Sequence, residues 1–434
     1  MFYFRKNIIF PIADFVMKTK TTYYLKAIHE MNTWSRSKID DWQREKLVDL
    51  INHSYNNTTY YKNLFDQNKI KPRDIKSIKD LNKIPPLTKN IIKENFKDLI
   101  ASNIKKYPYK NAQTGGSTAE PLKYFQDLNS WSYCYANHNY NWAKLGYEIG
   151  DKFLALGSSS IIPDAKPSLK HQIYYALKGK ISVSAMNLNE KSIIQIIDII
   201  NKNNIRYLYG YSSALFLLSK KIQKLNIKTT KIKGCISTSE LLLPEYRFEI
   251  EKTFNCKIID AYGAGDGGIT AFNLNDNYFN VAYNCLLETN KEVSSNSGLV
   301  YSTDLLNFSF PFIRYEVGDG AELGSNNAYN GQIITKLLGR KPNVIKLENG
   351  KVLIAPGFTV LFSGLNIKAY RINKTDINQI TIQVIKDKSY SNKDEEIIKN
   401  SFKHHAGKDC EIIITYHDSF LLSNSGKRDY FLTN

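Results

Sequence analysis

The chain has 434 residues, 42% of them hydrophobic, and a formal net charge of +18. This length exceeds what one compact core supports, so we expect two or three domains. The lysines are scattered and form no dense run of five or six, which favours a compositional bias over a surface for nucleic acid. We therefore expect no nucleic-acid partner.

Five cysteines are widely spaced, odd in number and without a C-x-x-C pair. This pattern argues against a disulfide framework and against a zinc cluster, and it favours a cytoplasmic location. No run of about 18 apolar residues is present to span a membrane.

The first 17 residues are apolar and lack the small-residue cleavage site of a secretory signal. We expect Pro11 to interrupt any helix in this segment. Two interpretations stay open, packing on the body of the protein or peripheral contact with the inner face of a membrane, and we favour packing.

The predicted elements begin with a helical preamble over residues 1–100, in which residues 42–61 carry apolar side chains at helical spacing and Pro85-Pro86 interrupts a second helical stretch. From residue 150 short β-rich runs alternate with helical stretches. The runs are residues 153–156, 181–185, 207–209, 234–237 and 257–261, and the helical stretches are residues 191–203, 213–224 and 244–254. This alternation predicts a largely parallel sheet covered by helices.

Residues 298–322 and 331–347 are β-like, and the tail pairs strand-like residues 379–384 and 411–416 with a helix near residues 393–402. The predicted fold class is α/β. A large amino-terminal domain, residues 1–339, holds the preamble (1–100) and an α/β core with a small β subdomain (101–339). A small mobile α+β domain follows over residues 340–434, with the linker near Gly339 and Arg340.

Polar motifs follow three of the predicted strands, where ligands bind in parallel sheets. The first is Tyr209, Gly210, Tyr211 and Ser212; the second includes Ser239 and Glu240; the third is Tyr262, Gly263, Ala264, Gly265 and Asp266. A tyrosine at a strand end can stack on a purine, and Asp266 can hold Mg²⁺, which prefers one or two carboxylates with phosphate oxygens. A glycine-rich turn with a capping aspartate explains the third motif equally well.

Before the sheet lies a run of small and hydroxyl residues, Thr114, Gly115, Gly116, Ser117 and Thr118. Its backbone N–H groups could form an anion-binding nest, and its hydroxyls could donate to phosphate oxygens. It is not a Walker loop. A polar hairpin turn is the competing explanation.

Three further residues complete the series. Asp319 presents two oxygens that could accept hydrogen bonds from both hydroxyls of a ribose, and Arg340 could add a cationic contact. The alternative for Asp319 is an internal ion pair with Arg314. Lys427 stands beside Gly426 in a polar segment, where a lysine is either solvated or able to insert into a site.

Taken in chain order, the motifs resemble those of the ANL superfamily of adenylate-forming enzymes. More narrowly, they resemble its phenylacetate-CoA ligase-like branch with the CapK-type capsular polysaccharide proteins. The resemblance covers nearly the whole chain, including Tyr60-Tyr61 and the Pro85-Pro86 segment of the preamble. It implies that ATP activates a carboxylate as an acyl-adenylate, which a thiol, an amine or a hydroxyl then attacks.

The resemblance assigns roles residue by residue. Residues 114–118 correspond to the phosphate loop, with Thr118 among the catalytic residues. Tyr262 corresponds to the residue that flanks adenine, Gly263 is among the nucleotide-binding residues, and Ser239 and Glu240 line the adenine side. Asp266 takes the place of the usual Mg²⁺-side Glu. The remaining assignments are Asp319 and Arg340 to ribose, and Lys427 to the lysine that bridges carboxylate and phosphate after rotation of the small domain.

This chain departs from the family pattern at Ala119, at Asp266 and at Asn343, where relatives have Gly, Glu and a hinge Asp. The substrate pocket is predicted from residues 133–138 together with Tyr209, Gly210, Tyr211 and Ser212.

We therefore expect a carboxylate-activating ligase of surface polysaccharide biosynthesis, with ATP and Mg²⁺ and a carboxylic or amino acid as substrate. The acceptor is an amino sugar, a carrier or CoA. An aryl- or acyl-CoA ligase is the alternative, and a catalytically degenerate nucleotide-binding scaffold is the third.

Overall fold

The computed structural model describes residues 8–114, 122–157, 169–185, 188, 190–274, 278–291, 296–326, 329–340, 344–346, 352–354, 365–376, 379–387, 389–406, 410–418 and 431–433. These residues divide into two compact units. The first comprises residues 1–288, 300–317 and 323–335, and the second comprises residues 289–299, 318–322 and 336–434. The predicted domain boundary between residues 339 and 340 falls at the carboxyl end of β13 and stays a prediction.

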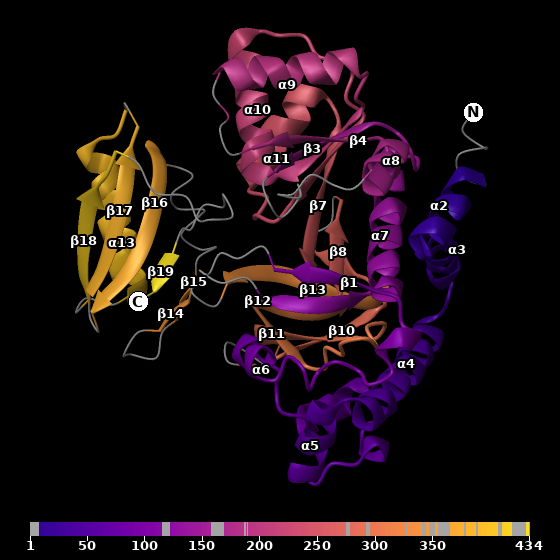
Figure 1. Cartoon of the computed structure of the whole chain (residues 1–434). Coiled ribbons are helices and arrows are strands. Elements are labelled where there is room, and N and C mark those ends of the chain that lie inside the picture. Colours follow the sequence, from indigo (N-terminus) through magenta and orange to yellow (C-terminus); the bar gives the residue numbers. More distant parts are fainter. Residues whose placement is uncertain are drawn as a thin grey trace. The chain divides into compact units, whose positions relative to one another are not determined.

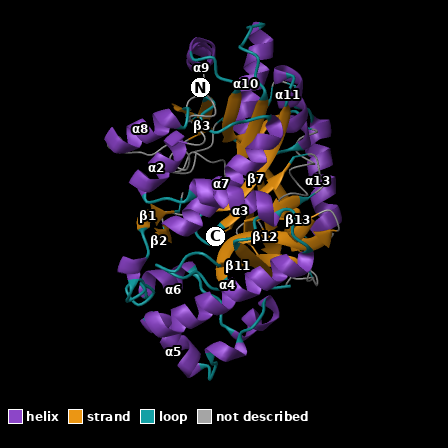
Figure 2. Cartoon of the chain, turned by 90° about the vertical axis from the view of Figure 1, so that its right-hand side faces the viewer, coloured by secondary structure: helices purple, strands orange, loops and turns teal. Residues whose placement is uncertain are grey.

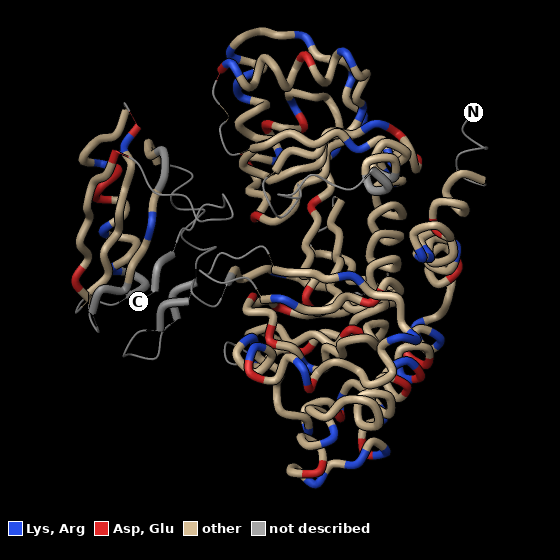
Figure 3. Tube along the Cα trace, viewed as in Figure 1, with Lys and Arg blue, Asp and Glu red and all other residues tan. Residues whose placement is uncertain are grey.

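The preamble is helical, as predicted. Its elements are α2 (Phe10–Met17), α3 (Thr21–Met31), α4 (Arg36–Asn57), α5 (Thr59–Gln67) and α6 (Lys89–Glu94). Hydroxyl side chains cap three of these helices: Ser35 accepts from the N–H of Lys38, Thr58 from Tyr61 and Thr88 from Ile91. Along α4 and α5, Lys and Arg alternate with Asp and Glu (Figure 3) and form ion pairs such as Arg36–Asp40 and Lys62–Asp66.

The expectation that Pro11 interrupts a helix is wrong. Pro11 lies in the first turn of α2, where its missing N–H would have no intrahelical acceptor. One face of α2, with Phe10, Ala13 and Asp14, is buried. The helix therefore packs on the first unit.

A hairpin and a long helix follow the preamble. The sequence offered a hairpin turn at residues 114–118 as one alternative and did not predict the helix. Strands β1 (Tyr109–Gln113) and β2 (Lys123–Asp127) pair antiparallel, and α7 (Leu128–Trp142) begins directly after β2. The Asp127 side chain caps α7 by accepting from the N–H of Asn129. Figure 1 shows α7 running beside α3 through the middle of the first unit.

The main sheet has eleven strands in the order β10-β11-β12-β13-β9-β8-β7-β6-β5-β3-β4. The five strands of this sheet that come first along the chain are β3 (Phe153–Gly157), β4 (Lys180–Ser184), β5 (Tyr207–Tyr211), β6 (Gly234–Thr238) and β7 (Lys257–Ala264). These five are mutually parallel. They lie within a few residues of the predicted runs, because alternation with helices identifies such strands well.

Helices cover both faces of the parallel strands. They are α8 (Leu169–Leu177), α9 (Glu190–Lys202), α10 (Ser212–Leu225) and α11 (Pro244–Phe254). In Figure 2 the strands lie between α7 and α8 on one side and α10 and α11 on the other. The core between these layers is apolar and includes Leu154, Leu156, Ile197 and Ile236.

The sheet continues with strands that alternate in direction. Strand β8 (Ile269–Asn273) pairs antiparallel with β7, β9 (Phe279–Val281) with β8, and β13 (Tyr329–Arg340) with β9. The remaining strands are β10 (Cys285–Thr289), β11 (Ser297–Asp304) and β12 (Tyr315–Asn326). The prediction of mostly parallel strands followed by a β subdomain is confirmed.

The second unit contains a separate four-stranded sheet in the order β18-β17-β16-β19. Its elements are β16 (Ile367–Asp376), β17 (Gln379–Lys386), α13 (Asn392–Ala406), β18 (Glu411–Tyr416) and β19 (Phe431–Thr433). Ile372, Ile382 and Phe402 are buried in its core. A two-stranded ribbon, β14 (Val344–Lys346) with β15 (Val352–Ile354), precedes it.

Candidate active site

The carboxyl ends of the parallel strands bring the predicted strand-end motifs side by side. In the sheet register Gly210 is opposite Ser237, Tyr211 is opposite Thr238, and Thr238 is opposite Ala261. Gly210 allows this spacing because a Cβ at its position would lie 2.4 Å from the carbonyl oxygen of Leu156 on β3. The segments with Tyr211, Ser239 and Tyr262 thus form one edge of the sheet, as the sequence predicted.

Residues 265–268 form a tight turn between β7 and β8, and side chains of neighbouring segments hold it by hydrogen bonds. Gly267 and Gly268 have φ values of +124° and +70°, which favour glycine, and a Cβ on Gly268 would lie 2.4 Å from the Asp304 carboxyl. The Ser302 hydroxyl donates to the carbonyl of Gly267 at 2.6 Å, and the Asn284 amide donates to that of Gly268 at 2.9 Å. The turn is therefore fixed in position.

Asp266 stands on this turn, and Tyr315 at the start of β12 holds its carboxylate. The Tyr315 hydroxyl donates to Oδ2 of Asp266 at 2.7 Å, and Asp266 is 9% exposed. The turn after β7 and the start of β12, which are distant in the sequence, thus meet through this hydrogen bond. An oriented single carboxylate at the end of a parallel sheet fits the donor set that Mg²⁺ uses together with phosphate oxygens.

Asp304, under this turn, is a residue that the sequence analysis missed. It is 1% exposed, accepts from the Ser130 hydroxyl at 2.5 Å, and accepts from the N–H of Leu306 at 3.1 Å. Burial raises its pKa from 3.8 to about 6. In the sequence Asp304 lies inside the β-like residues 298–322, and nothing local distinguishes a buried aspartate there from a turn residue.

We expect Asp304→Asn to reduce the pH dependence of stability between about pH 4 and 6. Because the pKa of Asp304 is raised in the folded protein, the folded protein keeps a proton that the unfolded chain releases. The contribution of protonated Asp304 to the free energy of unfolding is therefore complete below about pH 4, and it is lost as the pH rises through about 6. At about 1.4 kcal/mol per pKa unit it amounts to roughly 2–3 kcal/mol. Urea unfolding at several pH values measures it; an unchanged slope in the variant would contradict the assignment. The pKa of Asp260 is also raised to about 6, so part of the pH dependence of stability remains in the variant.

Glu240 is engaged with the start of α10. Its Oε2 accepts from the N–H of Ser213 at 3.1 Å, and the Ser212 hydroxyl donates to the carbonyl of Leu241 at 2.8 Å. A carboxylate at a helix amino terminus is stabilised by the helix dipole. Glu240 thus caps α10, in addition to the contact with the nucleotide that the sequence predicts for it. Ser239, before it, has a φ of +67°, which is strained for a serine.

Arg314 forms its ion pair with Glu288 at 3.4 Å, in contrast to the internal pair with Asp319 that the sequence left open. Its guanidinium also donates to the carbonyls of Asn82 and Ile84. Arg314 therefore ties the preamble to the sheet. Asp319 lies on β12 within the second unit and is partly exposed.

The remaining predicted residues divide into two groups. Thr114 is described, and it closes a loop: its N–H donates to the Leu122 carbonyl and its hydroxyl accepts from the Leu122 N–H, both at 3.0 Å. The second group lies outside the described residues and comprises Gly115, Gly116, Ser117, Thr118, Ala119, Asn343, the side chain of Arg340, and Lys427. Their assigned roles stay predictions.

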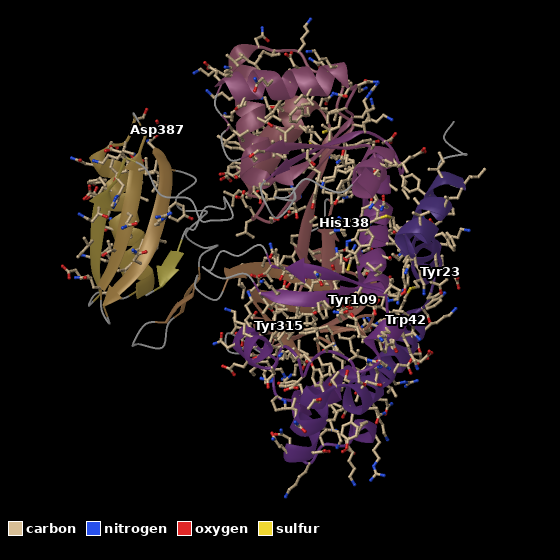
Figure 4. All side chains as sticks on the ribbon, viewed as in Figure 1. Tyr23, Trp42, Tyr109, His138, Tyr315 and Asp387 are labelled. Carbon is tan, nitrogen blue, oxygen red and sulfur yellow. The ribbon has the colours of Figure 1, made fainter. Side chains whose placement is uncertain are left out.

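The predicted pocket segment, residues 133–138, divides between two faces of α7. Tyr133 is buried beside α3, where its hydroxyl contacts Met31. His138, labelled in Figure 4, lies between α7 and β8, with its ring 4.9 Å from that of Phe272. Burial lowers the pKa of His138 to about 4, which keeps it neutral. Tyr209 joins the same face, since its ring lies 5.2 Å from that of Trp142.

Among the solved structures that share this fold are a CoA ligase, an amide bond synthetase and an ATP-bound protein. The chain aligns with 2-hydroxyisobutyryl-CoA ligase in the postadenylation state with a TM-score of 0.72 and 12% identity, over 93% of this chain and 91% of that one. The amide bond synthetase McbA from Marinactinospora thermotolerans aligns with a TM-score of 0.53 and 12% identity, over 74% and 67%. ATP-bound MatB from Rhodopseudomonas palustris gives a TM-score of 0.52 at 12% identity, over 74% of this chain and 66% of that one. The protein thus has the ANL fold.

Sequence comparison narrows the resemblance. Residues 346–434 match the CapK C-terminal domain. Protein CapK of Staphylococcus aureus is 21% identical over 433 residues, which cover 97% of this chain and 94% of that protein. The resemblance to the CapK-type branch is therefore confirmed along the whole chain.

Proposed function

We propose that this protein is an AMP-forming ligase that activates a carboxylate with ATP. The observation that carries the proposal is Asp266, oriented by Tyr315 on a turn at the carboxyl end of the parallel sheet. The ANL fold supports it, because the structural relatives include one protein captured with an acyl-AMP and one with ATP.

The chain's own residues supply the chemistry of adenylation as follows. Thr114 pairs with Leu122, and the N–H groups and hydroxyls of residues 115–118 would hold the phosphates. Asp266 would hold Mg²⁺, which neutralises charge on the phosphates when bound. Lys427 would stabilise the negative charge that builds as the carboxylate oxygen attacks the α-phosphorus and pyrophosphate leaves.

For the nucleotide we propose the contacts that the sequence predicts. Tyr262 and Gly263 would flank adenine with Ser239, and Asp319 and Arg340 would contact the ribose. Tyr209, Gly210, Tyr211 and Ser212 would lie on the acyl side, next to the aromatic face of α7.

A second step would transfer the acyl group to an amine, a hydroxyl or a thiol. We infer an acceptor in capsule or other surface polysaccharide biosynthesis, an amino sugar or a carrier, from the similarity to Protein CapK. CoA is the alternative acceptor, since 2-hydroxyisobutyryl-CoA ligase shares the fold and has a structure with CoA.

The test is pyrophosphate release with ATP and Mg²⁺ across a panel of carboxylic and amino acids, with hydroxylamine as the trap. Acid-dependent release with formation of a hydroxamate is the expected result. ATP binding without release for any acid would favour the degenerate scaffold. AMP release that requires CoA, rather than an amine, would select the CoA ligase.

We also propose that α2 contacts an anionic membrane surface. Its outer face carries Ile12 at 58%, Phe15 at 85% and Val16 at 51% exposure, opposite the face buried on the first unit. Lys18 and Lys20 follow it and are exposed, and Asp14 is buried, so the surrounding charge complements anionic lipid. No described helix is long and apolar enough to cross a bilayer, and the contact would be peripheral.

Phe15→Asp should weaken sedimentation with vesicles of phosphatidylglycerol and phosphatidylcholine by about tenfold or more, because burying a phenylalanine contributes about 1.5–3 kcal/mol. Phe248→Asp is the matched control, since Phe248 is 65% exposed on α11. Equal binding by wild type and both variants would contradict the proposal. A loss of dimers in light scattering of Phe15→Asp would indicate a second copy of the chain as the partner instead.

A further inference from the structure

A cluster of lysines lies on the aromatic face of α7, outside the motifs discussed so far. The rings of Trp131 and Tyr135, one turn apart, stack with centroids 5.4 Å apart and planes 5° apart. Lys110 from β1 and Lys178 from the end of α8 each place Nζ 4.9 Å from the Trp131 ring, and Nζ of Lys178 lies 3.4 Å from the Tyr135 ring. Two cations from distant segments therefore converge on one aromatic pair.

This arrangement brings two lysine amino groups together in a poorly solvated place. Lys178 is 5% exposed. Burial lowers its pKa well below the ordinary value, and the charges of Lys110 and Lys180 lower it further, against an opposing effect of Asp14. Burial also lowers the pKa of Lys110 to about 8. The lowered pKa values mean that burial disfavours the charged form of both amino groups, and an anion bound beside them would restore that form.

Asp14 already serves other partners. Its carboxylate accepts from the Thr19 hydroxyl at 2.6 Å and from the N–H and hydroxyl of Thr22, each at 2.7 Å. Three hydrogen bonds at the start of α3 hold this carboxylate, so it serves the α2–α3 junction as well as the lysines.

The cluster is adjacent to the candidate active site. Cys134 lies between Trp131 and Tyr135 in sequence, and its Sγ is 3.5 Å from the carbonyl of Gly268 on the turn that carries Asp266. Trp131, Tyr135 and His138 are partly exposed at helical spacing on the face of α7 that continues to Trp142 and Tyr209. An acyl chain lying along this face would pass Cys134 and the aromatic pair on which the two lysines lie.

We propose that Lys110 and Lys178 bind a second anionic group, a carboxylate or a phosphate, at the far end of the acid that the enzyme activates. The aromatic pair would pack against the body of this acid, and the ammonium groups would form charge-assisted hydrogen bonds to its distal anion. This inference rests on the proposed adenylation for its catalytic meaning. The substrate class is then an acid with two anionic groups, one of which is adenylated.

The experiment compares matched acids, hexanoate with adipate and phenylacetate with 4-carboxyphenylacetate, in two assays. Adenylation is followed as hydroxamate formation, and binding without ATP is followed by tryptophan fluorescence, with Trp131→Phe to identify the signal. The wild type should favour the dianionic member of at least one pair by about tenfold or more in kcat/KM and in Kd.

Lys110→Met and Lys178→Met should each raise the KM and Kd for the dianionic acid by about tenfold, and leave the monoanionic acid unchanged or improved. Lys38→Met is the control, since Nζ of Lys38 lies 4.0 Å from the Trp34 ring in α4. Methionine keeps most of the lysine's length, and Lys110, which is partly exposed, offers a variant less sensitive to folding than Lys178.

The two proposals fail separately. Preferential binding of the dianion that the lysine variants lose, without adenylation of any acid, would support the site and overturn the ligase. Adenylation with equal efficiency for both members of every pair, or an equal loss for both in the variants, would overturn the anion site and leave the ligase standing. Binding of neither acid of any pair would overturn the site.

Discussion

Lys427→Ala should lower the rate of acyl-adenylate formation by about 10²-fold or more. The resemblance assigns Lys427 to the bridge between carboxylate and α-phosphate, where removal of a preorganised positive group costs about this much. ATP binding should persist, because the phosphate loop, Tyr262 and Asp319 remain. The measurement is pyrophosphate release with the best acid of the panel, beside ATP affinity by calorimetry.

A control variant for this lysine is Lys393→Ala, at an exposed position of α13 in the same unit. It should retain full activity. An unchanged rate in Lys427→Ala would remove the lysine from the mechanism and favour the degenerate scaffold. An equal loss in both variants would point to damage of the second unit rather than to chemistry.

Asp266→Asn should reduce adenylation by about 10²-fold and raise the Mg²⁺ concentration needed for half-maximal rate. The neutral amide keeps the shape of the side chain and loses the charge that a hard cation requires. Tyr315→Phe should cost less, about tenfold, because the carboxylate remains and the 2.7 Å hydrogen bond from the Tyr315 hydroxyl is lost. Initial rates across a Mg²⁺ titration measure both effects.

Ser302→Ala serves as the control, because the Ser302 hydroxyl donates to the Gly267 carbonyl on the same turn without contacting Asp266. It should alter stability more than Mg²⁺ dependence. A Mg²⁺ dependence identical in wild type and Asp266→Asn would show that Asp266 serves the turn alone.

The large elements were predictable because their signals are local. The helices at residues 191–203 and 244–254 were predicted within one or two residues, as α9 (Glu190–Lys202) and α11 (Pro244–Phe254), since their apolar side chains repeat at helical spacing. Helix α7 was missed because it carries polar residues such as Asn137, Asn139 and Asn141 among its aromatics, and these are buried through tertiary contacts.

The sequence by itself determined the order and chemistry of the motifs, the alternation of strands and helices, and the edge of the sheet at which the motifs gather. These follow from residue type and short-range spacing. The tertiary structure alone decided that Tyr315 holds Asp266 across 49 residues, that Asp304 lies under Gly268, and that Lys110 and Lys178 meet on Trp131. Such contacts join segments distant in sequence, and they depend on which faces of the packed layers meet, which no local pattern specifies.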